Sequence, residues 1–122
     1  MKSVAPIVVL AAILFALPAH AQRAVDIHVR TAGDLADLCG ANPRDAVGDA
    51  KINYCHGFAQ AAVDVELRHA GDKKPFCFPS PAPTRTATLA EFVNWVRALP
   101  EHRTQGAVDG LLHFLGERFP CK

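Results

Sequence analysis

Cysteine is the residue type that offers the most chemistry in this 122-residue sequence, which contains Cys39, Cys55, Cys77 and Cys121. A thiol can form a disulfide, bind a metal or act as a nucleophile. The spacing contains no C-x-x-C pair, no H-x-x-x-H pair and no C-x-x-C-H haem attachment sequence. Zinc and haem sites usually carry such spacings, so the pattern argues against metal, haem and other cofactors.

The adjacent residues Cys55 and His56 are of the types that form a catalytic pair of a thiol nucleophile and a general base. Neighbours on a helix, however, point about 100 degrees apart and do not face each other. No other grouping combines a nucleophile with a base and an orienting group, or places two carboxylates at a shared site. Asp64 and Arg68 are four residues apart and are more simply an exposed ion pair. We therefore expect no enzymatic activity.

The N-terminus has the organisation of a secretory signal peptide. An apolar run of residues 4–17 follows the basic Lys2 and precedes the small-residue site Ala19-His20-Ala21. The run is shorter than the roughly 18 residues that a membrane-spanning helix requires. We expect residues 1–21 to be a signal peptide that is cleaved after Ala21, with residues 22–122 as one exported, periplasmic domain.

Export favours disulfides, because the thiols would reach an oxidising compartment and their number is even. A domain of about 100 residues buries only some 60 to 70 per cent of its unfolded surface, so covalent links add needed stability. We expect two disulfides, each contributing about 2 to 4 kcal/mol.

Charge argues against some classes of partner. The full chain has 13 Lys plus Arg and 12 Asp plus Glu, and cleavage would remove Lys2 and leave a neutral domain. The longest basic run is Lys73-Lys74. Nucleic-acid binding draws on clustered cations, so we expect no nucleic-acid partner. No second apolar segment indicates residence in a membrane after cleavage.

The elements that must position the cysteines are predicted to be helices. Residues 23–30 alternate apolar and polar side chains and predict a short extended arm. Thr31, with Asp34 three residues later, predicts the N-cap of a helix over residues 32–39 that ends at Gly40. Residues 40–49 contain Pro43 and Gly48 and predict a loop.

Three longer segments follow. Apolar residues at spacings of three and four predict a helix over residues 50–70, and the four prolines of residues 72–86 predict an extended surface loop. Thr88 and Glu91 form a capping box that predicts the start of a third helix, limited by Pro100. A fourth helix is predicted over residues 104–118. The expected fold is all-α, a small four-helix, up-down, bundle-like domain stapled by two disulfides.

Helix geometry narrows the disulfide pairing. Cys55 and Cys77 would lie roughly 25 Å apart if the long helix is straight, since a helix rises about 1.5 Å per residue. That distance is too long for a disulfide. Antiparallel packing of successive helices favours Cys39 with Cys55 and Cys77 with Cys121. The alternative, Cys39 with Cys77 and Cys55 with Cys121, stays open if a helix crosses at a steep angle.

Four segments together resemble a known family. They are TAGDLADLC from Thr31, YCHGF from Tyr54, FCFPSPAPT from Phe76 with LAEFVNWVRALPEH from Leu89, and the terminal FPC from Phe119. In this order, with their four cysteines, they resemble the Rap/Tai immunity family across nearly all of residues 22–122. The resemblance implies a small, exported, all-helical protein without catalysis. Its characterised relatives bind and block cell-wall amidase effectors delivered by type VI secretion, and a homodimer is expected by the same analogy.

The matching residues do not identify the surface that touches an effector. The proline-rich loop is preorganised, because each proline fixes its own φ and lowers the entropy lost on binding. Lys73, Lys74 and Arg85 could contact an acidic cleft rim, and we take them as candidate partner-binding residues. The alternative is a solvated loop that merely connects two helices.

A different function is a periplasmic stress protein of the acid-stress chaperone kind, or a binding protein of another class. Histidines at positions 28, 56, 69, 102 and 113 could charge as the pH falls and so expose apolar surface. Two disulfides would oppose such opening. Trp95 lies off the apolar stripe of its helix, so we expect it to be half exposed, either as an interface anchor or partly in the core.

Overall fold

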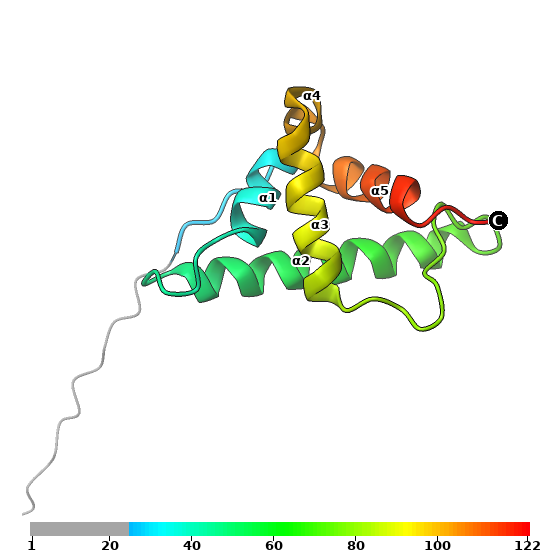
Figure 1. Cartoon of the computed structure of the whole chain (residues 1–122), viewed down its shortest axis with the longest axis horizontal. Helices are drawn as coiled ribbons and strands as arrows, with labels where there is room; N and C mark the ends of the chain where they lie inside the picture. The colour runs from blue at the N-terminus through cyan, green and yellow to red at the C-terminus, as the bar shows by residue number, and fades with distance from the viewer. Residues whose placement is uncertain (1–24) are drawn as a thin grey trace, which may run out of the picture.

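Five α-helices and no β-strand make up the regular structure of residues 25–122, the part of the chain that the computed structural model describes. The predicted signal peptide, residues 1–21, lies outside the described residues. The helices are α1 (Ala32–Cys39), α2 (Gly48–Ala70), α3 (Arg85–Ala98), α4 (Pro100–Thr104) and α5 (Ala107–Arg118). In Figure 1, α2 runs along the long axis of the molecule and α3 stands across it, with α4 at the far end of α3. The predicted all-α fold is confirmed.

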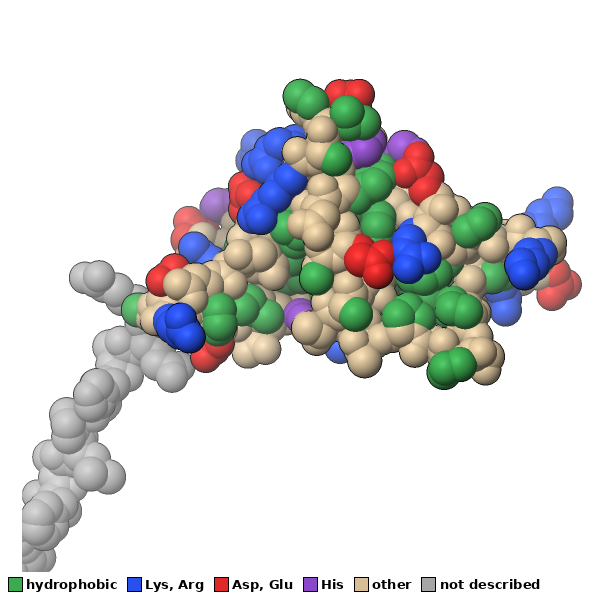
Figure 2. All heavy atoms as spheres, viewed as in Figure 1, with side chains coloured by type: hydrophobic (Ala, Val, Ile, Leu, Met, Phe, Trp, Pro, Cys, Tyr) green, Lys and Arg blue, Asp and Glu red, His purple; other side chains and the backbone are tan. Residues whose placement is uncertain are grey.

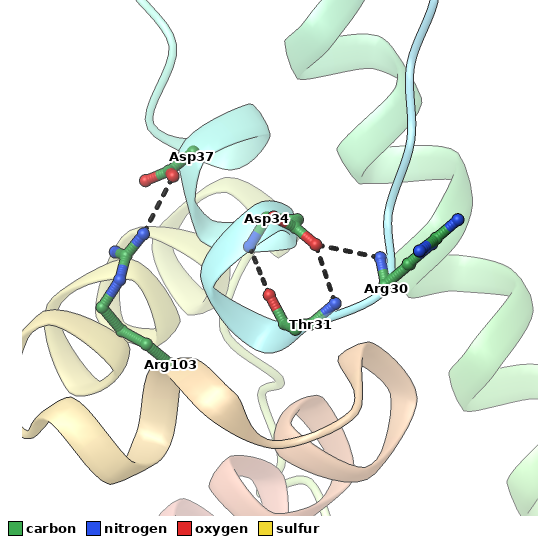
Figure 3. Close-up of polar contacts among 5 residues, drawn as sticks. All are labelled: Arg30, Thr31, Asp34, Asp37 and Arg103. Carbon is green, nitrogen blue, oxygen red and sulfur yellow. Dashed lines mark hydrogen bonds and ion pairs between the residues drawn. The ribbon is translucent and has the colours of Figure 1, made fainter.

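Helix α1 begins where the sequence predicts, because the side chains of Thr31 and Asp34 each accept a hydrogen bond from the backbone N–H of the other residue. The Thr31 hydroxyl accepts the Asp34 N–H at 3.1 Å, and the Asp34 carboxylate accepts the Thr31 N–H at 2.9 Å. The same carboxylate accepts the Arg30 N–H at 3.1 Å (Figure 3). These hydrogen bonds, with the one from the Thr31 backbone the largest effect, lower the pKa of Asp34. The capping box therefore stabilises α1 when Asp34 is ionised.

The core is built around α1, which packs against each of the other helices. Five of its eight residues are buried. Gly110 of α5 meets it closely, since a Cβ added at Gly110 would lie 2.6 Å from the Cβ of Ala32. The core side chains outside α1 come from α2, α3, α5 and the flanking loops, and they include Cys55, Ala59, Phe76, Leu89, Phe92, Val93, Val96, Leu111, Phe114, Leu115 and Phe119.

Helix α2 is the longest element, yet of its 23 residues only Gly48, Cys55 and Ala59 are buried. It starts two residues before the predicted start at residue 50. It ends at Gly71, whose φ of 55° is a conformation that glycine adopts without strain. Phe58, Ala62, Val63 and Leu67 are partly buried against the core, so α2 covers the core with one side and leaves its other side to solvent.

The predicted capping box of Thr88 and Glu91 is wrong. Helix α3 begins one turn earlier, because Thr84 is the N-cap and its hydroxyl accepts the Ala87 N–H at 3.1 Å. Thr88 lies inside the helix, where its hydroxyl donates to the Thr84 carbonyl at 3.1 Å. The Glu91 carboxylate instead accepts hydrogen bonds from Arg118 of α5.

The helix predicted over residues 104–118 is α5, which begins three residues later at Ala107; the short α4 before it was not predicted, so the described residues form five helices instead of four. Gln105 and Gly106 are extended between α4 and α5. The Ala32 N–H donates to the Gln105 carbonyl at 2.8 Å, and the Ala107 N–H donates to the Arg30 carbonyl at 3.0 Å. This pairing with residues 30–32 holds the backbone out of the helical conformation.

Two disulfides join the pairs that the distance argument favoured. Cys39 at the end of α1 is bonded to Cys55 of α2, with their Cα atoms 5.2 Å apart. Cys77 in the loop after α2 is bonded to Cys121 beyond α5, with a Cα separation of 4.9 Å. One bond thus ties the core helix to the long helix, and the other closes the opposite end of the domain.

Candidate functional site

The proline-rich loop between α2 and α3, residues 72–84, is held firmly at its centre. Besides the disulfide at Cys77, the Cys77 N–H donates to the Phe119 carbonyl at 2.7 Å. Phe76 is fully buried, and the ring of Phe78 lies 5.5 Å from that of Phe76 and 5.1 Å from that of Phe119, measured between centroids. Phe78 itself stays 39% exposed. The loop therefore presents an aromatic side chain at the surface from a fixed position.

A cavity of about 280 Å³ lies between this loop and the helices, and we call it the loop groove. Its apolar walls are Ala59 and Val63 of α2, Phe78 and Ala82 of the loop, and Leu111 and Leu115 of α5. Leu111 and Leu115 are buried core residues, so the groove opens onto the hydrophobic core itself. In Figure 2, hydrophobic side chains reach the surface where Figure 1 shows this loop, while charged side chains of both signs are scattered over the rest of that face.

The polar edge of the loop groove carries a positive charge. Arg85 and Gln60 both line it, and the Arg85 guanidinium donates to the Gln60 side-chain carbonyl. Gln60 in turn donates to Asp64 at 2.7 Å. Among the described residues no carboxylate lies within ion-pair distance of Arg85, whereas Arg103 pairs with Asp37 and Arg118 with Glu91.

The stability of α3 does not explain why the basic Arg85 stands at its start. Arg85 is the first residue of α3, where the helix dipole is positive and a basic side chain is mildly unfavourable. Its charge at the mouth of an apolar groove is therefore a feature that a bound group could use.

The other two candidate residues from the sequence lie elsewhere. Lys73 and Lys74 are exposed just beyond α2, where the Lys73 N–H donates to the Ala70 carbonyl at 2.9 Å. Neither lysine lines the loop groove. Their contact with a partner, like that of Arg85, stays a prediction.

A second apolar surface runs along α2; the periodicity of residues 50–70 predicts the helix but does not indicate this surface. Tyr54, Phe58, Ala61 and Val65 follow one another at spacings of four, three and four. Tyr54 is 41% and Val65 56% exposed, and the Tyr54 and Phe58 rings stack with centroids 6.5 Å apart. We call these four residues, with the adjacent Val108 of α5, the α2 strip. Together with Ala62 and Glu66, most of it lines one shallow apolar hollow.

Trp95 belongs to a cluster that joins α3, α4 and α5. Its indole N–H donates to Glu117 at 2.6 Å, and the His102 ring stacks on it with a centroid distance of 3.6 Å. His113 contacts the Trp95 ring edge and lies 3.2 Å from the same Glu117 carboxylate. The partners of Trp95 thus come from within the fold, and the half-buried ring is a structural element.

Residues 25–122 contain no group of three or more His, Cys, Asp or Glu that could hold a metal ion. None of the helices in this part of the chain has the length and apolarity needed to cross a membrane. Within residues 25–122, the loop groove and the α2 strip are apolar surfaces that a partner could contact.

A protein-family model described as Rap1a immunity proteins matches residues 31–121 of the sequence. The matched segment begins at the Thr31 cap and ends at Cys121, so it includes both disulfides, the proline-rich loop and the α2 strip. No curated protein and no solved structure matches the chain significantly.

Proposed function

The chain belongs to the Rap1a immunity protein family, and from this premise we propose that it binds and inhibits a cell-wall amidase effector delivered by type VI secretion. The observation that carries the proposal is the family match over residues 31–121, which spans the whole disulfide-linked body. Proteins of this family are in general not enzymes. An immunity protein acts by occupying the surface of a toxin, so it needs a stable shape and a complementary surface.

The structure supports a binding role without catalysis of its own. The disulfide at Cys77 and the packing of Phe76 and Phe78 hold the proline-rich loop before any partner arrives. A preordered surface loses less conformational entropy on binding than a flexible one. The imidazole of His102 contacts the Trp95 carbonyl, and that of His113 contacts the side chains of Gln105 and Glu117, so both rings have partners within the fold.

Export to the periplasm is part of the proposal. An amidase that attacks the cell wall acts outside the cytoplasm, and an immunity protein must meet it there. Disulfides also form and persist in that compartment. N-terminal sequencing of the protein recovered from the periplasm should start at Gln22, and a protein that remains in the cytoplasm with residues 1–21 attached would refute this part.

Self-association through the α2 strip is a further part of the proposal. Spacings of four, three and four between apolar residues are typical of the seam between two helices that pack lengthwise. Light scattering of the purified domain should show a dimer, and Val65→Asp should convert it to a monomer. Leu99→Asp is the matched control, because Leu99 is 44% exposed and lies away from α2 at the junction of α3 and α4. A monomeric unmodified domain would contradict the dimer.

Co-expression tests the central claim. The full chain is produced together with candidate amidases that are directed to the periplasm, and growth and complex formation are followed. Protection that requires residues 1–21, together with a stable complex, is the expected result. A version without residues 1–21 is the control, since it should not protect. The proposal would be overturned if the full chain protected against none of the amidases tested. If instead the protein prevented unfolded proteins from aggregating at acid pH, the chaperone alternative would be favoured.

A further inference from the structure

We infer that the loop groove receives one large apolar side chain of the effector, and that a carboxylate next to this side chain in the effector pairs with Arg85. The inference rests on the proposed function and adds to it the location and chemistry of the contact. The occupant is thus a protein segment with an aromatic or branched apolar residue beside an acidic one.

The size of the loop groove selects this kind of occupant. Its volume of about 280 Å³ lies just below the range of about 300 to 1,000 Å³ that is usual for small-molecule sites. A single large side chain is therefore a better fit than a cofactor. Protein interfaces commonly place a few such anchors in apolar pockets, and these anchors carry most of the binding energy.

The positive charge of Arg85 at the edge of the loop groove favours an acidic residue next to the apolar side chain of the effector. Arg85 donates to the neutral amide of Gln60 and has no carboxylate partner among the described residues. A carboxylate that approaches would form a charge-assisted hydrogen bond with the guanidinium, and partial exclusion of water by the apolar walls would strengthen it. An acidic residue beside the anchor therefore complements the groove, and a basic one would be repelled.

The apolar walls from α5 and the loop are held by packing and by prolines. Leu111 and Leu115 are 1% and 2% exposed and belong to the packed core, and Phe78 is held by the rings of Phe76 and Phe119. Prolines at positions 79, 81 and 83 fix their own φ angles along the loop. The cavity therefore exists before binding and does not have to be opened by the partner.

The α2 strip is a separate surface. At about 100° per residue, Tyr54, Phe58 and Val65 lie on nearly the opposite side of α2 from Val63 and Gln60, which line the loop groove. A second copy on the strip would therefore leave the groove open to the effector.

Two substitutions test the contact with the amidase that the co-expression experiment identifies. Ala82→Trp fills the groove from an exposed wall position, and Arg85→Glu reverses the charge at its edge. Each should weaken the affinity of the full mature chain for the amidase at least about tenfold, as loss of a central anchor does. The matched controls Ala46→Trp and Arg44→Glu alter exposed residues of the loop before α2, and their affinities should stay within about twofold of the unmodified protein. Melting temperatures of all four variants are measured to show that they fold.

A second measurement needs no amidase. N-acetylphenylalanine has an aromatic ring and a carboxylate, and N-acetylphenylalaninamide has the same ring with a neutral amide in place of the carboxylate. Methyl resonances of Val63, Leu111 and Leu115 should shift on titration with the acid, less with the amide, and not in Ala82→Trp. Shifts that are absent at these methyls, or equal in Ala82→Trp, would overturn the assigned chemistry of the groove.

The affinity measurements and the titration together distinguish failure of the groove inference from failure of the proposed function. If the unmodified protein binds the amidase and folded Ala82→Trp and Arg85→Glu bind equally well, the groove inference is wrong and the proposed function stands. If the unmodified protein binds no amidase, the proposed function fails, and the titration decides whether the groove takes an apolar, anionic group.

Discussion

The eight-residue helix α1 and the 23-residue helix α2, the longest of the described helices, play opposite parts in this protein. Helix α1 has eight residues, five of them buried, and contacts every other helix. Helix α2 has 23 residues and buries three. The difference shows that burial follows position in the fold and not helix length. One helix forms the core, and the other provides surfaces on two of its sides.

The two helices are also stabilised by different means. Helix α1 is capped by Thr31 and Asp34, anchored to α4 by the ion pair of Asp37 with Arg103 at 3.0 Å, and surrounded by core side chains (Figure 3). Helix α2 has no side-chain cap at its N-terminus and is held by the disulfide at Cys55 and a few buried residues. Substitutions in the two helices should therefore differ strongly in their effect on the free energy of unfolding.

The largest effect is expected from Leu35→Ala in α1. Leu35 is fully buried, and the substitution should lower the free energy of unfolding by about 2 to 5 kcal/mol, because it leaves a cavity in the packed core. Urea denaturation followed by circular dichroism measures it. Leu35→Met keeps the volume and should cost less than about 1.5 kcal/mol. A small loss with Leu35→Ala would contradict the central role of α1.

Next is the bond that joins the two helices. The double variant Cys39→Ser with Cys55→Ser removes the disulfide between two cysteines that are 16 positions apart in the sequence. Its loss should lower the free energy of unfolding by about 3 kcal/mol. Hydrogen exchange should accelerate most in the first turns of α2, which have no side-chain cap. Equal acceleration throughout the core would show that the disulfide does not tether α2 specifically.

The cap of α1 should have a smaller effect that depends on pH. Thr31→Ala or Asp34→Asn should each lower the free energy of unfolding by about 1 kcal/mol near neutral pH. Because folding lowers the pKa of Asp34, its contribution is fully present above the ordinary aspartate pKa. It is lost as the pH falls through the lowered value. The difference between the unmodified protein and Asp34→Asn should therefore shrink on acidification, and a difference that grows would contradict the assigned role of the carboxylate.

The smallest effect on stability is expected on the exposed face of α2. Val65 is 56% exposed, so Val65→Ala should change the free energy of unfolding of the monomer by no more than about 0.5 kcal/mol. The measurement uses protein diluted until light scattering shows a monomer. A loss as large as that of Leu35→Ala would mean that the strip is part of the folded core and not a free surface.

Local sequence patterns predicted much of the fold, and they failed where distant residues decided the outcome. The Thr31 cap and the bounds of α1 depend on neighbouring residues and came out as predicted. Thr84 and Thr88 are both able to cap a helix, and the local pattern favoured the wrong one. The break at Gln105 and Gly106 depends on hydrogen bonds to residues 30–32, more than 70 positions earlier, which no local pattern contains.

The surfaces were harder to predict than the helices. The sequence singled out Arg85 and the proline-rich loop, but nothing in it indicated that a cavity opens onto Leu111 and Leu115. The spacing of apolar residues over 50–70 also predicted the helix without indicating the exposed α2 strip. Periodicity shows that a helix has apolar positions, and it does not show which of them another element covers.

The amino-acid sequence by itself determined the helical content, the favoured disulfide pairs and the family resemblance, because these depend on residue types, on spacing along the chain and on the rise of a helix. Only the tertiary structure decided that the short α1 is the centre of the core, that a separate helix α4 precedes α5, and that Arg85 stands at an apolar groove. These features arise from contacts between residues far apart in the chain, which exist only once the helices have packed.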